Sequence, residues 1–361
     1  MKILAVAGSS GGHIFPAISF LETLKDHYKD LDSLLLLPKI SIEKYSQDLQ
    51  ANVEFLSVTN IKNIPSVVLF SKAFFESMSI LVRYNPNIVV SFGSVVSVPV
   101  ALCAHVLGKK ILLHEQNVIP GRANKFLSGF ADRIAISFEK TREYFKKRKE
   151  KIVFTGNPLR KSLCLIDKRE ALDFFGFSPD KFTILVMGGS QSSHNINRGF
   201  LRAVLPMPVK EKLQVIHLSG SSDFEELDRL YKELNIKYKI YPFFSSMQNA
   251  YSAADLVIAR AGATTIAELI SYRIPAVLIP YPYAYKHQTA NAKVLEAAGA
   301  AIIVRDEELN NLTLRDIIGG CLRNPETLKN MRAGYEAFPR YNANELLIKI
   351  TMEYCNVKTS S

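Results

Sequence analysis

Short apolar runs alternate with longer amphipathic stretches along most of this 361-residue chain. Apolar runs bounded by glycine, proline or polar residues predict buried strands, and the amphipathic stretches between them predict helices. The predicted strands are Lys2–Ala7, Ile88–Ser91, Ile111–His114, Arg133–Ser137, Ile152–Thr155, Thr183–Met187, Gln214–Leu218, Tyr238–Tyr241, Leu256–Ala259 and Ala276–Ile279. Strands alternating with helices are typical of βαβ units, so we predict an α/β protein with doubly wound parallel sheets.

The two halves of the chain begin in the same way. The segment ILAVAGSSGGHIF at Ile3–Phe15 is echoed by ILVMGGSQSSHNI at Ile184–Ile196. Each segment joins an apolar strand, a turn of small residues and the start of a helix. Together with the chain length, this echo predicts two Rossmann-like domains. The boundary should lie near TGNPLRKSL, where Pro158 ends a strand.

Composition narrows the class of protein. The formal net charge of +11 favours an anionic partner, and no nucleic-acid-binding motif accompanies the basic run Lys146–Lys149. Four separated cysteines, without CxxC or metal-ligand spacing, favour a reduced, cytosolic compartment. The uncharged segment Ile88–Leu107 is long enough to cross a bilayer. Its Gly93, Pro99 and His105 favour a buried strand followed by a buried helix instead.

The first glycine turn, Gly8–Gly12, matches neither the dinucleotide fingerprint nor the P-loop. Its small residues let backbone N–H groups approach an anion, and the following helix adds its positive end. His13 begins that helix beyond the carboxyl end of a strand, where ligands of such sheets bind. A neutral imidazole accepts a proton near pH 7. A plain tight turn followed by a surface histidine is the alternative interpretation.

The stretch IARAGATTIAELISY contains a second candidate anion site. We expect a helix to start at Ala263–Thr265, directly after a strand, so that two hydroxyls and several backbone N–H groups meet there. Glu268 lies about one turn further along. It either completes a capping box with Thr265 or accepts hydrogen bonds from a ribose, and the spacing favours neither interpretation.

Amide side chains form two further groups of candidates. Gln288 and Asn291 are three residues apart and should share a helix face, and Asn117 follows a strand in the segment LLHEQN. Amides both donate and accept hydrogen bonds, which suits sugar hydroxyls, although capped loops use them too. The segment lacks the second histidine of HExxH, so it predicts no zinc site.

Taken in order along nearly the whole chain, GSSGGHIFPA, HEQNVIPGRANK, GNPLR, MGGSQSSHNIN, RAGATTIAE and KHQTANA resemble the MurG family of glycosyltransferases. The resemblance implies a GT-B type fold, in which two Rossmann-like domains face a cleft. An acceptor and membrane-facing domain would occupy residues 1–160 and a UDP-sugar donor domain residues 161–338. A helix at 339–361 would return to the first domain.

The resemblance also implies the reaction. N-acetylglucosamine would pass from UDP-N-acetylglucosamine to the 4-hydroxyl of the N-acetylmuramic acid of lipid I, giving lipid II and UDP in peptidoglycan synthesis. No cofactor, metal or nucleic acid is implied. His13 would be the general base of an inverting displacement. Helix N-termini and backbone amides would meet the charge on the leaving UDP.

The resemblance implies a role for each group of substrate-binding residues. Glu268 would bind the ribose, the helix start and Ser190 the diphosphate, and Arg160 with the backbone near Phe244 the uracil. Gln288 and Asn117 would read the sugar hydroxyls. The implied substrate-binding residues are Ser10, Gly11, Gly12, Asn117, Arg160, Ser190, Phe244, Ala263, Thr264, Thr265, Ile266, Ala267, Glu268, Gln288 and Asn291.

The implied acceptor is a membrane lipid, so we expect a peripheral enzyme on the cytoplasmic face of a bacterial inner membrane, bound to anionic lipids. The segment SVVLFSKAFFESMSILVRY is either an interfacial helix or a helix buried against the sheet. Its apolar candidates, which lie among Lys72 and Arg83, are Leu69, Phe70, Phe74, Phe75 and Met78.

Three loops depart from the family pattern, and other functions stay open. The first loop reads Gly-Ser-Ser-Gly-Gly-His where Gly-Gly-Thr-Gly-Gly-His is usual, and the donor loop has Ser192 where a small residue, often Gly, is expected. The family tends toward Gly-Gly-Tyr where this chain has Gly93-Ser94-Val95, a loop associated with the acceptor diphosphate. A UDP-sugar transferase with a different lipid acceptor and a non-catalytic nucleotide-sugar-binding subunit are alternatives. A UDP-N-acetylglucosamine 2-epimerase would need further acid/base carboxylates, which the motifs do not supply.

Overall fold

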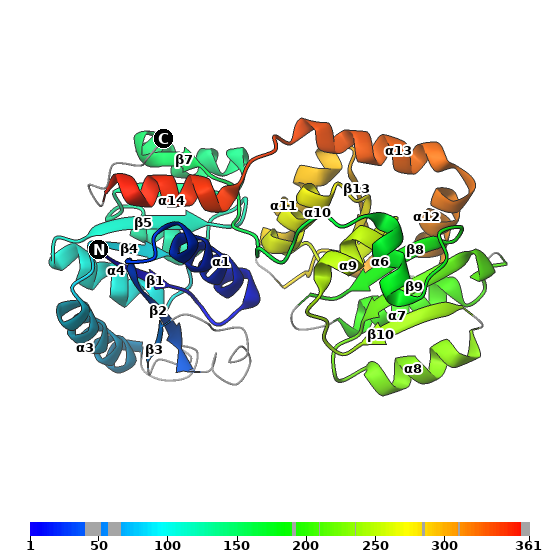
Figure 1. The fold of residues 1–361 in the computed structure, drawn as a ribbon, viewed down its shortest axis with the longest axis horizontal. Coiled ribbons are helices and arrows are strands. Elements are labelled where there is room, and N and C mark those ends of the chain that lie inside the picture. Colours follow the sequence, from blue (N-terminus) through cyan, green and yellow to red (C-terminus); the bar gives the residue numbers. More distant parts are fainter. Residues whose placement is uncertain are drawn as a thin grey trace. The chain divides into compact units, whose positions relative to one another are not determined.

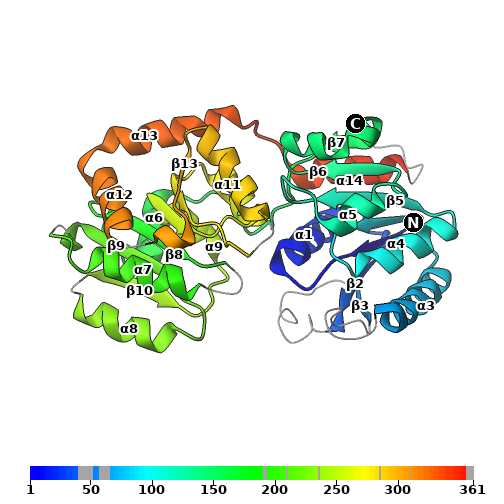
Figure 2. The same cartoon turned by 180° about the vertical axis from the view of Figure 1, so that it is seen from behind.

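The computed structural model describes residues 1–39, 52–56, 66–189, 193–208, 210–234, 236–283, 286–309 and 311–354 (Figures 1 and 2). The chain divides into two compact units. One consists of Met1–Lys161 with Tyr341–Ser361, and the other of Ser162–Arg340. Each unit contains one parallel sheet with helices packed on it. The predicted α/β class with doubly wound parallel sheets is therefore confirmed.

The first unit is built on a seven-stranded sheet with the order β3-β2-β1-β4-β5-β6-β7. At its centre, Leu4 of β1 is level with Leu34 of β2 and Val89 of β4, and all three side chains are buried. The strand order reverses between β1 and β4, the point at which ligands of such sheets bind. The strands are β1 (Lys2–Val6), β2 (Asp32–Pro38), β3 (Asn52–Leu56), β4 (Ile88–Ser91), β5 (Lys110–Glu115), β6 (Arg133–Ile136) and β7 (Ile152–Phe154).

Helices cover both faces of this sheet. One buried cluster joins α1 and α14 to one face, and a second joins α3, α4 and α5 to the other. The last helix therefore packs beside the first, as Figure 1 shows in red and dark blue. Ser19 of α1 strengthens this contact by donating from Oγ to Asn344 Oδ1 of α14 at 3.1 Å. The helices are α1 (Gly11–His27), α3 (Ser66–Tyr84), α4 (Ser97–Val106), α5 (Arg122–Leu127), the 3-10 segment η2 (Glu139–Lys151) and α14 (Ala343–Glu353).

The uncharged segment Ile88–Leu107 forms β4 and the buried helix α4, as the sequence predicted. The apolar character of β4 follows from its burial on both faces of the sheet, since Ile88 and Val90 belong to the cluster with α1 and α14, and Val89 to the cluster with α3 and α4. In the part of the chain that the structure describes, every helix is too short or too polar to span a bilayer.

The second unit repeats the design with the strand order β10-β9-β8-β11-β12-β13, again entirely parallel. Its strands are β8 (Phe182–Met187), β9 (Leu213–Leu218), β10 (Lys237–Tyr241), β11 (Leu256–Ala259), β12 (Ala276–Leu278) and β13 (Ala301–Ile303). Its helical segments are α6 (Lys168–Phe175), α7 (His194–Val204), η3 (Lys210–Lys212), α8 (Phe224–Glu233), α9 (Met247–Ala253), α10 (Ala263–Tyr272), α11 (His287–Ala297), η4 (Asp306–Glu308), α12 (Asn311–Arg323), α13 (Pro325–Ala333) and η5 (Gly334–Ala337).

The strands that the sequence predicted are all present, and their ends agree with the prediction to within one residue. Strands β2, β3 and β13 were not among them. A continuous leucine run such as that of β2 cannot be told from a buried helix by periodicity. The other two are edge strands, and only their short, half-buried patterns distinguish them from loops.

Candidate functional site

In the first unit, the loops after β1 and β4 flank the point where the strand order reverses. Gly8 and Ser94 bring these two loops into contact. A Cβ atom built on Gly8 would lie only 2.4 Å from Ser94 Cβ, so glycine alone fits there. Gly93 and Ser94 both have left-handed backbones, with φ of +85° and +80°. A left-handed serine is uncommon and costs conformational energy.

His13 lies in the first turn of α1, whose N-cap residue is Ser10. The Ser10 hydroxyl does not cap the helix; its Oγ lies 2.7 Å from His13 Nδ1. The imidazole extends toward the second loop, since a methyl group built on Gly93 would lie 3.4 Å from His13 Cδ2 and 3.3 Å from Asn124 Nδ2. The His13 ring and the Asn124 amide therefore both approach Gly93, which has no side chain to separate them.

The buried carboxylate of Glu115 holds the Asn124 side chain by a hydrogen bond. Its Oε2 accepts from Asn124 Nδ2 at 2.8 Å and from the Gly121 backbone N–H at 3.0 Å. Its Oε1 accepts from the Asn117 backbone N–H at 2.9 Å. Burial raises the pKa of the Glu115 carboxyl above its ordinary value, and the hydrogen bonds from Asn117, Asn124 and Gly121 oppose that shift. The HEQN segment thus runs from the end of β5 into a loop that is held around the Glu115 carboxylate.

The neighbouring His114 is also buried, and it ties β5 to the end of β7. Its Nε2 lies 2.9 Å from the Gly156 carbonyl, and its Nδ1 lies 3.1 Å from Gln116 Nε2. Burial lowers the pKa of His114 to about 4, although the contact with Gly156 favours the charged form. His114 is therefore a neutral structural histidine near pH 7.

In the second unit, the corresponding loops follow β8 and β11. Ser193 is the N-cap of α7, and its Oγ accepts from the Ile196 backbone N–H at 3.4 Å. Arg260, at the end of β11, donates from Nη2 to the same Oγ at 2.7 Å and from Nη1 to the Ile279 carbonyl at 3.1 Å. Asp306 pairs with the guanidinium. Arg260 thus connects the ends of two strands to the start of α7.

Helix α10 begins at Ala263 with Gly262 as its N-cap, so no side chain caps its first turn. The capping-box interpretation is therefore wrong, because Thr265 and Glu268 both lie inside the helix. Glu268 is 8% exposed, and its Oε2 accepts a hydrogen bond from the Tyr251 hydroxyl at 2.7 Å. One oxygen of the carboxylate is therefore bonded to α9.

Gln288 and Asn291 share one face of α11, as their spacing predicted. Gln288 Oε1 accepts from the backbone N–H groups of Ala261 at 3.2 Å and Tyr281 at 2.9 Å. Asn291 Nδ2 donates to the Ala261 carbonyl at 3.2 Å. Both amides hold the segment that leads into α10.

The remaining predicted residues lie as follows. Gly11 and Gly12 are in the first turn of α1, and Ile266 and Ala267 are in α10. Arg160 belongs to the first unit, where its guanidinium lies 4.8 Å from the centre of the Phe15 ring. Phe244 belongs to the second unit, in contact with Tyr241 and Phe175. Ser190 lies outside the described residues. Among the described side chains, no group of three or more His, Cys, Asp or Glu residues could hold a metal ion.

Comparison with known proteins decides the family. Residues 3–136 match the glycosyltransferase family 28 N-terminal domain, and residues 183–347 match its C-terminal domain. A protein of Thermodesulfovibrio yellowstonii, named UDP-N-acetylglucosamine--N-acetylmuramyl-(pentapeptide) pyrophosphoryl-undecaprenol N-acetylglucosamine transferase, is 35% identical over 97% of this chain and 98% of its own. The crystal structure of Acinetobacter baumannii MurG has a TM-score of 0.79 at 26% identity, covering 98% of this chain and 100% of that one. This chain belongs to the MurG family.

Membership of the MurG family makes the chain a glycosyltransferase of GT-B type. The fold alone would not have decided this. A UDP-GlcNAc 2-epimerase from Neisseria meningitidis has a TM-score of 0.70 over 98% of this chain, but it is only 14% identical. That likeness shows a shared architecture and nothing more.

Three residues that hold these loops and side chains in place were not selected from the sequence: Asn124, Arg260 and Tyr251. Asn124 and Arg260 stand inside quoted motifs, so their position in HEQNVIPGRANK and RAGATTIAE was the available signal. Tyr251 carried no such signal, because its partner Glu268 is 17 residues further along the chain.

Proposed function

We propose that this chain transfers N-acetylglucosamine from UDP-N-acetylglucosamine to the 4-hydroxyl of the N-acetylmuramic acid of lipid I, forming lipid II and UDP in peptidoglycan synthesis. The observation that carries the proposal is the start of α10. The first turn of the helix, whose N-cap is Gly262, and the buried carboxylate of Glu268 occur there within two helical turns. The names of relatives that match along the whole chain support the same substrates.

The second unit would bind the donor. The first turn of α10 offers N–H groups and the positive end of the helix dipole to a diphosphate. Glu268 would accept hydrogen bonds from the ribose hydroxyls, which are donors of the kind a carboxylate prefers. Gln288 and Asn291 would act by holding the Ala261 backbone, with the Gln288 side chain also facing the sugar. Phe244 and Arg160 would lie by the uracil, and Ser190 by the diphosphate.

The first unit would supply the base. His13 can use Nε2 as a base only when its proton is on Nδ1, and the Ser10 hydroxyl at 2.7 Å from Nδ1 can accept that proton in a hydrogen bond. The dipole of α1 disfavours the imidazolium form and so favours the unprotonated imidazole, which is the form that can accept a proton. Asn117, whose backbone N–H is held by Glu115, would read the sugar hydroxyls together with Gln288.

In the reaction, His13 Nε2 takes the proton of the acceptor 4-hydroxyl while that oxygen bonds to the anomeric carbon. The bond between the anomeric carbon and the diphosphate oxygen breaks, and UDP leaves with the electron pair. A single displacement inverts the α-linked donor to a β(1→4) product. Backbone amides and helix N-termini would stabilise the charge that develops on the leaving diphosphate.

The first experiment is turnover of UDP-N-acetylglucosamine by the purified chain with a short-chain lipid I analogue, with and without EDTA. UDP release that requires the acceptor and survives EDTA is the expected result. Donor binding without turnover would point to a different lipid acceptor or a missing partner. Failure to bind the donor would overturn the assignment of the second unit.

A variant of His13 tests the base. We expect His13→Gln to lower turnover about 100- to 10,000-fold, because general base catalysis contributes that much. His27→Gln is the matched control, since His27 is an exposed histidine in the last turn of the same helix, 2.8 Å from Glu345. Turnover of His13→Gln close to that of His27→Gln would exclude His13 as the base.

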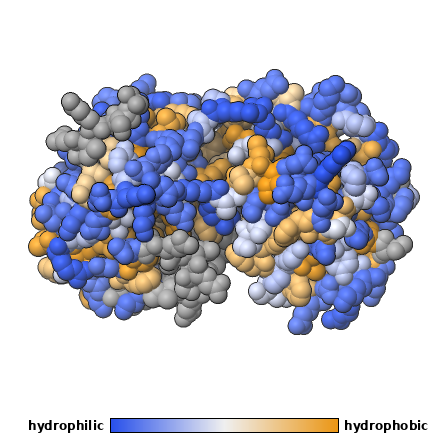
Figure 3. All heavy atoms as spheres, viewed as in Figure 1, coloured by the Kyte–Doolittle hydropathy of each residue, from blue (hydrophilic) through white to orange (hydrophobic). Residues whose placement is uncertain are grey.

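The same proposal includes peripheral attachment to an anionic membrane surface through α3. Val68, Phe75 and Val82 are 68%, 71% and 61% exposed, and their spacing of two helical turns places them in one stripe. Figure 3 shows orange residues among blue ones over this helix. Lys72 and Arg83 are exposed beside the stripe.

The face of α3 proposed to contact the membrane therefore contains fewer of the apolar candidates than the sequence suggested. Phe74 and Met78 pack against the buried cluster of the sheet, so for them the alternative of burial is correct. Phe70 is half-buried, and the side chain of Leu69 lies outside the described residues. Phe75 remains as the aromatic residue of the exposed stripe.

Vesicle sedimentation tests this attachment. The chain should bind vesicles that contain anionic phosphatidylglycerol at low salt and dissociate at high salt. Replacing both Phe75 and Val82 with serine should weaken binding about 10-fold or more, because insertion of their apolar surface is lost. Leu205→Ser, which changes an exposed apolar residue of the second unit, is the control. Equal binding by both variants would exclude α3 as the attachment surface.

A further inference from the structure

The buried tyrosine of α9 is the nearest support of the proposed ribose-binding carboxylate. Tyr251 is 1% exposed, and its hydroxyl donates to Glu268 Oε2 at 2.7 Å. The hydroxyl also lies 3.7 Å from Met187 Sδ at the end of β8, but the sulfur is the longer and weaker acceptor. The strong hydrogen bond of this hydroxyl is therefore the one to the carboxylate.

A carboxylate near the start of a helix needs such support if it is to recognise a ligand. A glutamate side chain rotates about three bonds, and each orientation points its oxygens in a different direction. Tyr251 holds Oε2 from the interior of the unit, because the residue is buried, its ring lies against that of Tyr272 in α10 and its hydroxyl reaches Met187 at the end of β8. With one oxygen held, the plane of the carboxylate is set before any ligand arrives.

We propose that Tyr251 is a positioning residue that orients Glu268 toward the two ribose hydroxyls of the nucleotide donor. This inference rests on the proposed function, in which Glu268 binds the ribose. Neighbouring hydroxyls on a ribose present two donors with fixed spacing, so their affinity for a carboxylate depends on its orientation. Tyr251 thereby contributes to discrimination between ribose and deoxyribose donors without touching the ligand.

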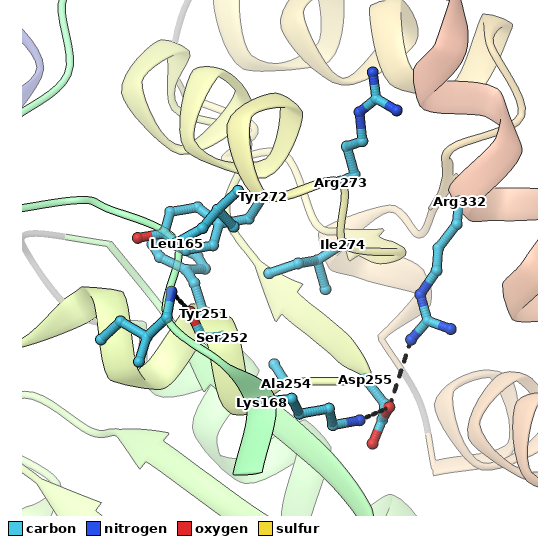
Figure 4. A pocket seen from close by; sticks show the side chains of 11 residues that line it. Leu165, Lys168, Tyr251, Ser252, Ala254, Asp255, Tyr272, Arg273, Ile274 and Arg332 are labelled. Carbon is cyan, nitrogen blue, oxygen red and sulfur yellow. Dashed lines mark hydrogen bonds and ion pairs between the residues drawn. The ribbon is translucent and has the colours of Figure 1, made fainter. Parts of the chain in front are cut away.

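A second tyrosine provides a matched control. The Tyr272 ring lies 5.0 Å from that of Tyr251, and it is also buried. Its hydroxyl donates to the Cys164 backbone carbonyl at 3.0 Å. Figure 4 shows both rings in the wall of a 340 Å³ pocket that Leu165 and Ser252 also line. Tyr272→Phe thus removes the same atom from a neighbouring ring, but from a bond to the backbone.

The experiment compares Tyr251→Phe, Tyr272→Phe and Glu268→Gln with the unchanged chain. Each is assayed with UDP-N-acetylglucosamine and with its 2′-deoxyuridine counterpart, at saturating short-chain lipid I analogue. We expect Tyr251→Phe to raise KM for the ribose donor about 10-fold, to leave kcat within about 2-fold, and to leave KM for the deoxyribose donor nearly unchanged. Glu268→Gln should abolish the preference for ribose, and Tyr272→Phe should retain it.

The outcomes separate this inference from the proposed function. If Glu268→Gln is impaired while Tyr251→Phe keeps the ribose preference of the unchanged chain, Tyr251 has no positioning role. A rise in KM of Tyr251→Phe that is equal for both donors would show a general packing defect and would also overturn the inference. If Glu268→Gln retains the ribose preference, Glu268 does not bind the ribose, and the donor site fails together with the role of Tyr251. Thermal unfolding of each variant identifies loss of folded protein.

Discussion

Replacing Gly8 with alanine should disturb the proposed base through a single steric contact. The added Cβ would lie 2.4 Å from Ser94 Cβ and 2.5 Å from Ser94 Oγ. Carbon atoms in contact prefer about 3.5–4.0 Å, so one loop must move by about 1 Å. Overpacking of this kind costs about 1–3 kcal/mol of unfolding free energy. A displacement of about 1 Å in a reacting group lowers turnover about 100-fold.

The second loop offers a rescue with a matched control. Ser94→Gly removes both atoms that the new methyl group would meet, and the next neighbour, His13 Nδ1, lies at an ordinary contact distance of 3.4 Å. Glycine also adopts the φ of +80° at this position without steric cost. Ser94→Ala removes Oγ but keeps Cβ, so it should not rescue.

The assay is turnover with the lipid I analogue together with urea unfolding. Gly8→Ala should be impaired in both, and the combination with Ser94→Gly should approach Ser94→Gly alone. Normal turnover and stability of Gly8→Ala would refute the predicted clash. Rescue by Ser94→Ala as complete as that by Ser94→Gly would refute the assignment of the clash to the two Cβ atoms.

Three further predictions concern stability. Burial lowers the pKa of His114 in the first unit to about 4 and that of His217 in the second unit to about 3. Because the unfolded histidines accept protons at a higher pH, the free energy of unfolding of each unit should fall by about 3 kcal/mol between pH 6.5 and pH 4. A free energy of unfolding, measured with urea, that stays constant across this range would contradict the prediction. Leu347→Ala should destabilise the first unit by about 2–5 kcal/mol, because this fully buried residue of α14 belongs to the cluster under α1, and calorimetry should show a lower transition temperature. Gly334→Ala should destabilise the second unit by about 3 kcal/mol, since its Cβ would lie 2.2 Å from the Ala298 carbonyl oxygen; an unchanged transition would exclude that contact.

The alternation of apolar and amphipathic segments was sufficient to predict the class of fold. Strands such as Ile88–Ser91 and Leu256–Ala259 are buried on both faces of a parallel sheet, so their apolar runs are nearly continuous and easily recognised. The positions of the loops followed from the same pattern, because a glycine-rich turn after a central strand leads into a helix in each unit. His13 was selected as a candidate on that local basis.

Tertiary structure decided what the local pattern left open. The spacing of Thr265 and Glu268 matched a capping box, and only the packing of α9 against α10 showed Glu268 bonded to Tyr251 instead. In the same way, Phe74 and Phe75 are neighbours in α3, and the sequence pattern did not decide which of them is buried. The packing of α3 on the sheet places Phe74 against the buried cluster and leaves Phe75 exposed.

The physical reason is the range of the interactions. Strand and helix formation depends on neighbours within a few residues, so the sequence by itself determined the α/β elements and their alternation. The partner of a buried polar group is chosen by whichever element packs against it. Tyr251 and Arg260 therefore acquired their hydrogen-bond partners only when separate elements of the chain packed together.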